Sequence, residues 1–191
     1  RDACGKFATG ENALMLDIGG GSNEFIITNG VEILWKKSFP IGMARMREKF
    51  AYEDPIPQEV AAEFIKFNEE VLVELWEMVE KFGPRIFIGS SGSFDTFKDL
   101  IFNCGYGELP SIELAMEDLI KLDDTLVASL ASERLQMPGM SPIRVDYIVL
   151  ASIFTRYVLE KLQPRIIYQS SFSLKEGGMK EEFDNYLNSK I

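Results

Sequence analysis

Hydrophobic positions near the start of the chain follow the spacing of β-strands. Residues 13–18 and 24–28 are short apolar runs on either side of a glycine-rich turn, and residues 31–39 form a third run after the hairpin signal Asn29-Gly30. Strands joined by such short turns pair as antiparallel neighbours. The pattern therefore predicts a three-stranded antiparallel meander.

After Pro57 the spacing of apolar residues changes to that of an amphipathic helix. Apolar side chains recur three or four residues apart on one stripe, and Gly83-Pro84 ends the pattern. The residues of this stripe are Val60, Phe64, Phe67, Val71, Leu75 and Val79. The spacing predicts one long helix between residues 57 and 83.

The remainder of the chain reads as strands that alternate with helices. Residues 85–89 are typical of a buried parallel strand, and residues 165–171 predict a last strand. Helical patterns cover residues 94–102, 113–135, 144–162 and 174–183. A meander followed by crossover units predicts one α/β domain, with a mixed five-stranded sheet and helices on both faces.

Composition excludes several classes of protein. The chain is 46% hydrophobic, yet it contains no apolar run that approaches the roughly 18 residues of a membrane span, and its start does not resemble a signal peptide. We therefore expect a cytoplasmic protein that binds no membrane. Cys4 and Cys104 lack CxxC spacing and the chain has no histidine, which excludes a zinc site and a histidine-assisted nucleophile.

The net charge of −10 argues against broad nucleic-acid binding. One stretch departs from this acidic balance, because residues 36–49 contain five basic residues and the single acid Glu48. The basic residues are Lys36, Lys37, Arg45, Arg47 and Lys49. They form either a solvated face or a patch that attracts anions.

The first turn contains three consecutive glycines, Gly19, Gly20 and Gly21, followed by Ser22. Turns with positive φ prefer glycine, which is one explanation. A third glycine followed by a hydroxyl favours a nest of backbone N–H groups that binds a phosphate oxygen. The turn is not a dinucleotide fingerprint, because it leads into a strand, and it lacks the Gly-Lys-Ser/Thr of a Walker loop.

Two carboxylates flank this turn. Asp17 ends the first predicted strand and Glu24 begins the second, so an antiparallel hairpin brings them together. Two acids beside a phosphate would repel it unless a cation lay between them, and Mg²⁺ or Mn²⁺ bound by both carboxylates would supply that charge. The alternative is that Glu24 is a surface acid on a solvated strand face.

A second polar loop follows the buried strand at residues 85–89. It comprises Gly89, Ser90, Ser91, Gly92 and Ser93, and its N–H groups and hydroxyls would suit a second phosphate or a sugar. Taken alone, such a loop is more often a helix cap. Together with the glycine turn, it predicts a second wall of one cleft.

Three further segments accompany these two loops. SFPIGMARMREKF follows the hairpins, MPGMSPIRVDYIVLASIF spans the start of the late helix, and SSFSLKEGG lies near the end of the chain. In this order the motifs resemble the exopolyphosphatase and guanosine pentaphosphate phosphatase (Ppx/GppA) family over about residues 13–182. The resemblance implies an actin-like ATPase (ribonuclease H-like) fold, in which two α/β domains close over a phosphate ligand. Residues 1–12 would be an interdomain linker and residues 13–191 the second domain, with the first domain absent from this chain.

The resemblance also implies roles for individual residues. Asp17 and Glu24 match the family's acids near the metal, and residues 17–22 and 89–93 match its phosphate loops. Arg45, or else Arg47, is expected to contact phosphate. Asn23 replaces a common threonine, which would alter the metal or phosphate environment, whereas Ser90 and Ser93 replace threonines and keep the hydroxyl.

Family members remove the terminal phosphate of inorganic polyphosphate or guanosine pentaphosphate with a divalent metal and an attacking water. The family's catalytic glutamate is expected upstream of Arg1, so no catalytic residue is expected in this chain and the isolated chain is expected to be inactive. The partners implied are the substrate and the missing N-terminal domain, and a homodimer is an open alternative. An actin-like sugar kinase and a non-catalytic sensor of guanosine polyphosphates remain as other functions.

Overall fold

The computed structural model describes residues 10–103 and 111–171, which form a mixed α/β unit around a six-stranded sheet. Strand order is β3-β2-β1-β4-β6-β5. The strands are β1 (Ala13–Ile18), β2 (Asn23–Thr28), β3 (Ile33–Phe39), β4 (Ile86–Ser90), β5 (Ser111–Leu114) and β6 (Ile166–Ser170). Strands β1 to β3 form the predicted antiparallel meander, and β1, β4 and β6 run parallel.

The sixth strand, β5, lies at the edge of the sheet where helix was predicted from residue 113 onward. It pairs antiparallel with β6, and Leu114 is buried opposite Ile167. Four residues are too few to show a period, so pairing with β6 decides their conformation. Helices α6 (Met116–Ala128) and α7 (Ala131–Arg134) occupy the rest of the predicted helical stretch.

The long helix predicted after Pro57 is divided in two. Helix α3 (Gln58–Val71) and helix α4 (Val73–Phe82) meet at Leu72, whose φ of −94° and ψ of 16° leave the helical region. Leu72 is fully buried, so the apolar stripe continues through the bend and does not reveal it. A further short helix, α2 (Met43–Lys49), was not predicted, because only Met43 and Met46 form its buried face.

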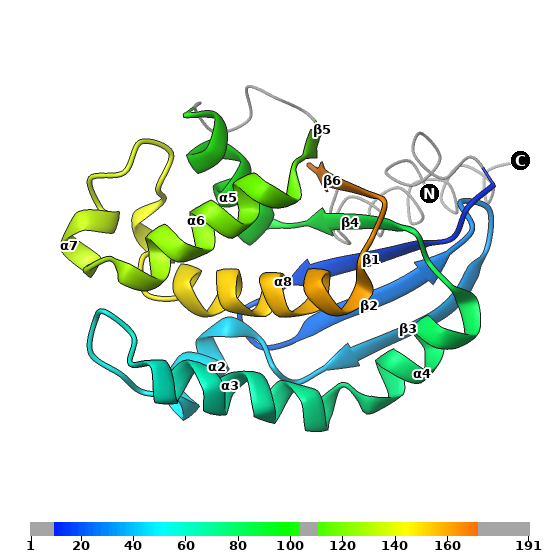
Figure 1. Ribbon diagram of the computed structural model, residues 1–191, viewed down its shortest axis with the longest axis horizontal. Helices are drawn as coiled ribbons and strands as arrows, with labels where there is room; N and C mark the ends of the chain where they lie inside the picture. The colour runs from blue at the N-terminus through cyan, green and yellow to red at the C-terminus, as the bar shows by residue number, and fades with distance from the viewer. Residues whose placement is uncertain (1–9, 104–110, 172–191) are drawn as a thin grey trace, which may run out of the picture.

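The remaining helices are α5 (Gly92–Phe102), the 3₁₀ turn η1 (Pro142–Arg144) and α8 (Ile148–Leu162). Helix α8 lies across the middle of the sheet, with α6 on one side and α2 and α3 on the other (Figure 1). None of the described helices has the length and apolar character needed to span a membrane.

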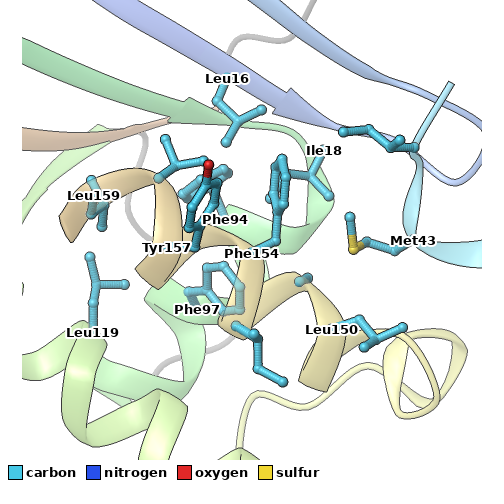
Figure 2. Close-up of a cluster of buried hydrophobic side chains, with 14 of the residues drawn as sticks. Leu16, Ile18, Met43, Phe94, Phe97, Leu119, Leu150, Phe154, Tyr157 and Leu159 are labelled. Atoms are coloured by element: carbon cyan, nitrogen blue, oxygen red, sulfur yellow. The ribbon is translucent and has the colours of Figure 1, made fainter. Parts of the chain in front are cut away.

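One hydrophobic core joins the helices to the sheet. Figure 2 shows part of it, where Ile18 from β1, Met43 from α2, Phe94 from α5 and Phe154 from α8 converge. A smaller cluster of Ala13, Ile86 and Ile88 lies on the other face of the sheet. The described helices bury their apolar side chains in the first core; the predicted helix at residues 174–183, like most of the predicted linker, lies outside the described residues.

Candidate functional site

The two loops singled out in the sequence leave the sheet from neighbouring strands. The glycine turn (residues 19–22) follows β1, and the serine loop (residues 89–93) continues from β4 into α5. Because β1 and β4 are parallel and adjacent, with Asp17 paired to Ser90, both loops lie at the same end of the sheet (Figure 1). Ligands in α/β sheets bind at the carboxyl ends of such strands. The sheet therefore brings the predicted loops together.

The glycines of the turn are not required by a left-handed backbone conformation. None of Gly19, Gly20 and Gly21 has a positive φ. A Cβ at Gly19 would lie 2.6 Å from the carbonyl oxygen of Ser22, whereas a Cβ at Gly20 would meet only the Ala44 Cβ at 3.7 Å, and one at Gly21 would meet nothing within 4 Å. Crowding thus explains Gly19 alone, and the open positions of Gly20 and Gly21 fit the close approach of a ligand.

The start of helix α2 is hydrogen-bonded to the carbonyl groups of the glycine turn. The N–H groups of residues 42–45 donate hydrogen bonds of 2.9 to 3.2 Å to the carbonyl oxygens of residues 19–21. Within residues 10–103 and 111–171, the N–H groups of Gly20 and Gly21 make no hydrogen bond. The turn therefore has the free donors that a phosphate nest needs.

This attachment depends on Gly42, which sequence reasoning missed. Gly42 is fixed as the residue before α2, and a Cβ there would overlap the backbone of Gly20, Gly21 and Ser22. The two backbones touch because neither carries a side chain at the contact. Its signal in the sequence is a single glycine between a strand pattern and MARMREK.

The carboxylates of Asp17 and Glu24 belong to directly paired residues of β1 and β2, as predicted. Glu24 is half-buried, and its Oε1 accepts hydrogen bonds from the hydroxyls of Ser22 and Ser38, the latter at 2.7 Å. The Ser22 hydroxyl is thus directed to Glu24. Glu24 is thus hydrogen-bonded to two serines while it remains partly exposed.

The part of the chain that the structure describes contains no group of three or more acidic, cysteine or histidine side chains suited to a metal. Two carboxylates nevertheless fit Mg²⁺, which usually takes one or two carboxylates and completes its shell with phosphate oxygens and water. Asp17 and Glu24 have the oxygen donors for such a shared site.

The structure distinguishes between the two candidate arginines. Arg45 is exposed, and its Nε donates to the carbonyl of Gly21 at 3.3 Å, which places its side chain beside the glycine turn. The Arg47 guanidinium instead stacks on the Tyr52 ring at 4.1 Å and donates to the Tyr52 carbonyl at 2.9 Å. Arg45 is therefore the better placed of the two candidates beside the glycine turn, and Arg47 stabilises the segment after α2.

Asn23, predicted to alter the metal or phosphate environment, is fully buried. Its Nδ2 donates to the carbonyl of Ile41 at 3.1 Å, and as a strand neighbour of Glu24 it points to the opposite face of the sheet. Asn23 thus acts on the segment that leads into α2, away from the carboxylates.

The serine loop is packed tightly on both sides. A Cβ at Gly89 would overlap the ring of Phe94, so this position is a glycine because the Phe94 ring packs against its backbone. Ser90 and Ser93 are buried, and Ser91 lies between them with a φ of 73° and a ψ of 174°. Part of the loop's glycine and serine content is therefore structural.

Gly92 has a different neighbour, because a Cβ there would overlap the guanidinium of Arg144. Arg144 is half-buried and makes no salt bridge or side-chain hydrogen bond with any residue that the structure describes. It also lies near Asp95, whose carboxyl pKa is raised, because the effect of burial exceeds the lowering by Lys98 and by Arg144. An arginine with free donors against a loop of free N–H groups suits an anion.

Sequence reasoning missed Arg144, although it lies in the motif MPGMSPIRVD. The signal was a lone arginine directly before a strongly apolar helix. Its contact with Gly92 spans 52 positions of sequence, so no local pattern predicts it.

Comparisons with known proteins agree with this geometry. A model of the Ppx/GppA phosphatase family matches residues 2–185. An exopolyphosphatase from Cytophaga hutchinsonii is 36% identical with a TM-score of 0.88, over 93% of this chain and 59% of that one. The Ppx/GppA family member of Aquifex aeolicus is 24% identical with a TM-score of 0.81, over 96% and 61%. These likenesses confirm the predicted actin-like α/β fold.

Curated relatives are more distant in sequence. The guanosine-5'-triphosphate,3'-diphosphate pyrophosphatase of Pseudoalteromonas translucida is 25% identical over 93% of this chain and 35% of its own length. A bifunctional 3-dehydroquinate synthase/phosphatase of Fusobacterium nucleatum is 27% identical over 92% of this chain and 27% of its own length. The chain therefore spans about a quarter to a third of the length of these curated relatives and about three fifths of the solved ones.

Proposed function

This chain belongs to the Ppx/GppA phosphatase family, and from that premise we propose that it is the second domain of a phosphohydrolase that removes the terminal phosphate of inorganic polyphosphate or guanosine pentaphosphate. Residues 1–12 would link it to a first domain that supplies the other wall of the cleft. The family supports hydrolysis of phosphate groups, and the substrate and domain arrangement are our inference.

The open glycine turn is the observation that carries this proposal. Gly20 and Gly21 have no packing reason to lack a side chain, and their N–H groups have no partner among residues 10–103 and 111–171. Two donors on a backbone without side chains can approach a phosphate oxygen closely. Arg45 beside the turn adds a positive charge at the same place.

The serine loop would hold a neighbouring phosphate group. Arg144 lies against Gly92 at the start of α5, where helix N–H groups favour an anion. A planar guanidinium can donate two parallel hydrogen bonds to one phosphate. Two phosphate sites on adjacent loops suit a phosphoanhydride, which joins two phosphoryl groups.

Asp17 and Glu24 would hold the divalent cation, Mg²⁺ or Mn²⁺, which would supply positive charge to balance that of the phosphate oxygens. The chain's own residues then orient the phosphoanhydride and stabilise its negative charge. Activation of the water requires a general base, which we assign to a glutamate of the first domain.

A phosphate-release assay of the full-length protein with Mg²⁺ tests the proposal. We expect release from polyphosphate, from guanosine pentaphosphate, or from both. ATP-dependent phosphorylation of a sugar acceptor would refute hydrolysis in favour of an actin-like kinase. Tight binding of guanosine polyphosphate without turnover would refute it in favour of a sensor.

A further inference from the structure

Arg134, the last residue of α7, is a charged side chain in the interior of the protein. Only 1% of its side chain is exposed. Its guanidinium makes four hydrogen bonds: Nε donates to the Val145 carbonyl at 3.0 Å, Nη1 to the Ser129 carbonyl at 2.7 Å and to the Ser129 hydroxyl at 3.3 Å, and Nη2 to Asp54 Oδ2 at 2.6 Å. One side chain therefore joins the end of α6, the residue after η1 and the segment after α2.

Stability alone is a weak reason for this buried arginine. Removing a pair of charges from water costs about as much as their attraction returns, so apolar residues of similar size often stabilise a protein equally well. The pair with Asp54 is also incomplete, because Asp54 Oδ1 is buried and has no hydrogen-bond partner among the described residues. A guanidinium does provide a rigid, planar set of donors, which fixes several acceptors relative to one another.

One of these acceptors lies next to Arg144. None of the residues of η1 (Pro142–Arg144) is buried, so packing in the core does not fix this turn. Val145, the next residue, is buried, and Arg134 binds its carbonyl. The bond thus holds the backbone one residue away from Arg144, whose guanidinium lies against Gly92.

The other partner, Asp54, connects the same turn to the glycine turn. Asp54 follows Tyr52, and Arg47 of α2 holds Tyr52 through stacking and a hydrogen bond. The start of α2 is in turn hydrogen-bonded to the glycine turn. A continuous series of contacts therefore runs from the glycine turn through Asp54 and Arg134 to Arg144 and the serine loop.

We propose that Arg134 is a positioning residue: paired with Asp54, it holds the η1 turn so that Arg144 faces the serine loop in a fixed relation to the glycine turn. Because Arg134 is buried, it acts through Arg144 and not by contact with the substrate. This inference rests on the proposed function, in which Arg144 binds a phosphate group. It adds that the spacing of the two proposed phosphate sites depends on an ion pair between residues 80 positions apart.

The experiment is a double-mutant cycle in the full-length protein, because contacts in series show coupling only when it is measured. The cycle compares wild type, Arg134→Lys, Arg144→Ala and the variant with both changes. Arg134→Lys keeps the positive charge for Asp54, but a single ammonium cannot reproduce the planar fork that also binds Val145 and Ser129.

Arg156→Lys is the matched control. Arg156 also forms ion pairs between two helices, with Asp123 and Asp124 of α6 and Glu160 of α8, and these helices carry neither loop. Each variant is measured for Tm, for the rise in Tm caused by inorganic phosphate, and for the kcat and KM of phosphate release. The substrate is polyphosphate or guanosine pentaphosphate, whichever the wild type hydrolyses.

We expect Arg144→Ala and Arg134→Lys each to raise KM by about 10- to 100-fold, the effect of losing or misplacing one charged donor, with a smaller effect on kcat. Each should also reduce the phosphate-induced rise in Tm. The variant with both changes should have the KM of Arg144→Ala alone, because Arg134 acts through that residue. Arg156→Lys should keep the KM of wild type.

A further pair of variants separates positioning from stability. Arg134→Met leaves Asp54 as an unpaired, partly buried charge, which should lower Tm by about 5–15 °C. Adding Asp54→Asn removes that charge and should recover part of the lost Tm. KM should stay raised in both variants, because the Val145 carbonyl has lost the donor that anchors it.

The inference fails if Arg134→Lys or Arg144→Ala has the KM and phosphate response of wild type, or if Arg134→Met combined with Asp54→Asn regains the wild-type KM. Effects on KM that multiply in the double-mutant cycle, or an equal rise in KM in Arg156→Lys, would show that Arg134 does not act through Arg144. If wild type hydrolyses neither substrate, the proposed function fails, and the phosphate-induced rise in Tm across the same cycle decides the role of Arg134 separately. No such rise in wild type would overturn both.

Discussion

Two glycines that touch each other should respond to substitution in opposite ways. A side chain at Gly42 would overlap the backbone of the glycine turn, whereas a Cβ at Gly20 would meet only the Ala44 Cβ at 3.7 Å. Gly42→Ala is therefore expected to damage the fold. Gly20→Val should leave the fold intact and fill the space where we propose that a phosphate oxygen binds.

The expected size of each effect follows from these contacts. Gly42→Ala introduces overpacking that costs about 1–3 kcal/mol. It also disturbs the four hydrogen bonds from residues 42–45 to the turn, each with a net value of about 1 kcal/mol. Loss of all four bonds would bring the total to about 5–7 kcal/mol, which corresponds to a fall in Tm of about 10–28 °C. Gly20 is exposed, so Gly20→Val should change stability by less than about 1 kcal/mol.

Thermal denaturation followed by circular dichroism, combined with phosphate release by the full-length protein, separates the two effects. Gly20→Val should melt near wild type and lose turnover. If Gly20→Val unfolds together with its loss of activity, the glycine is needed for the turn itself. If it keeps full activity, no phosphate approaches the backbone at Gly20, and the reasoning about the nest is wrong.

Three further experiments test the remaining assignments. Arg45→Ala should raise KM for the phosphate substrate with little change in Tm. Arg47→Ala loses its stacking on Tyr52, which should lower the free energy of unfolding by about 1 kcal/mol and Tm by a few degrees. The reverse pattern would exchange their roles. Asp17→Asn and Glu24→Gln should each increase the Mg²⁺ concentration needed for half-maximal turnover, because each removes a carboxylate from the proposed metal site. Normal metal dependence in both variants would show that these carboxylates are structural. The isolated chain of 191 residues should fold and should bind phosphate only weakly, because its loops are exposed to water, where charge interactions are weak. It should release no phosphate above background, because we assign the general base to the first domain. Robust turnover would place the catalytic base within this chain.

Features that depend on near neighbours were readable from the sequence. The alternating runs around the glycine turn predicted the meander, and the hairpin placed Asp17 opposite Glu24, as the strand pairing confirms. Strand and helix periods also predicted the mixed α/β fold. Each of these rests on spacings of two to four residues, which persist whatever the rest of the chain does.

Short elements escaped this reasoning. The bend at Leu72 lies within an unbroken apolar stripe, and β5 has too few residues to display a period. Pairing with β6 and packing against the sheet determine both, and neither influence is visible within a short window of sequence.

The chemistry of the loops depended even more on distant contacts. Sequence alone marked residues 19–22 and 89–93 as loops that favour phosphate, but it did not show which glycines serve packing and which remain open. The backbone of Gly42 contacts the first loop, and the guanidinium of Arg144 contacts the second. Both contacts exist because the fold brings together segments that are distant in the sequence. Close approach between segments far apart in the chain leaves no periodic trace. The sequence therefore determined the longer strands and helices and the types of residue at the site, while tertiary packing decided the short elements and which loop residues are free to meet a ligand.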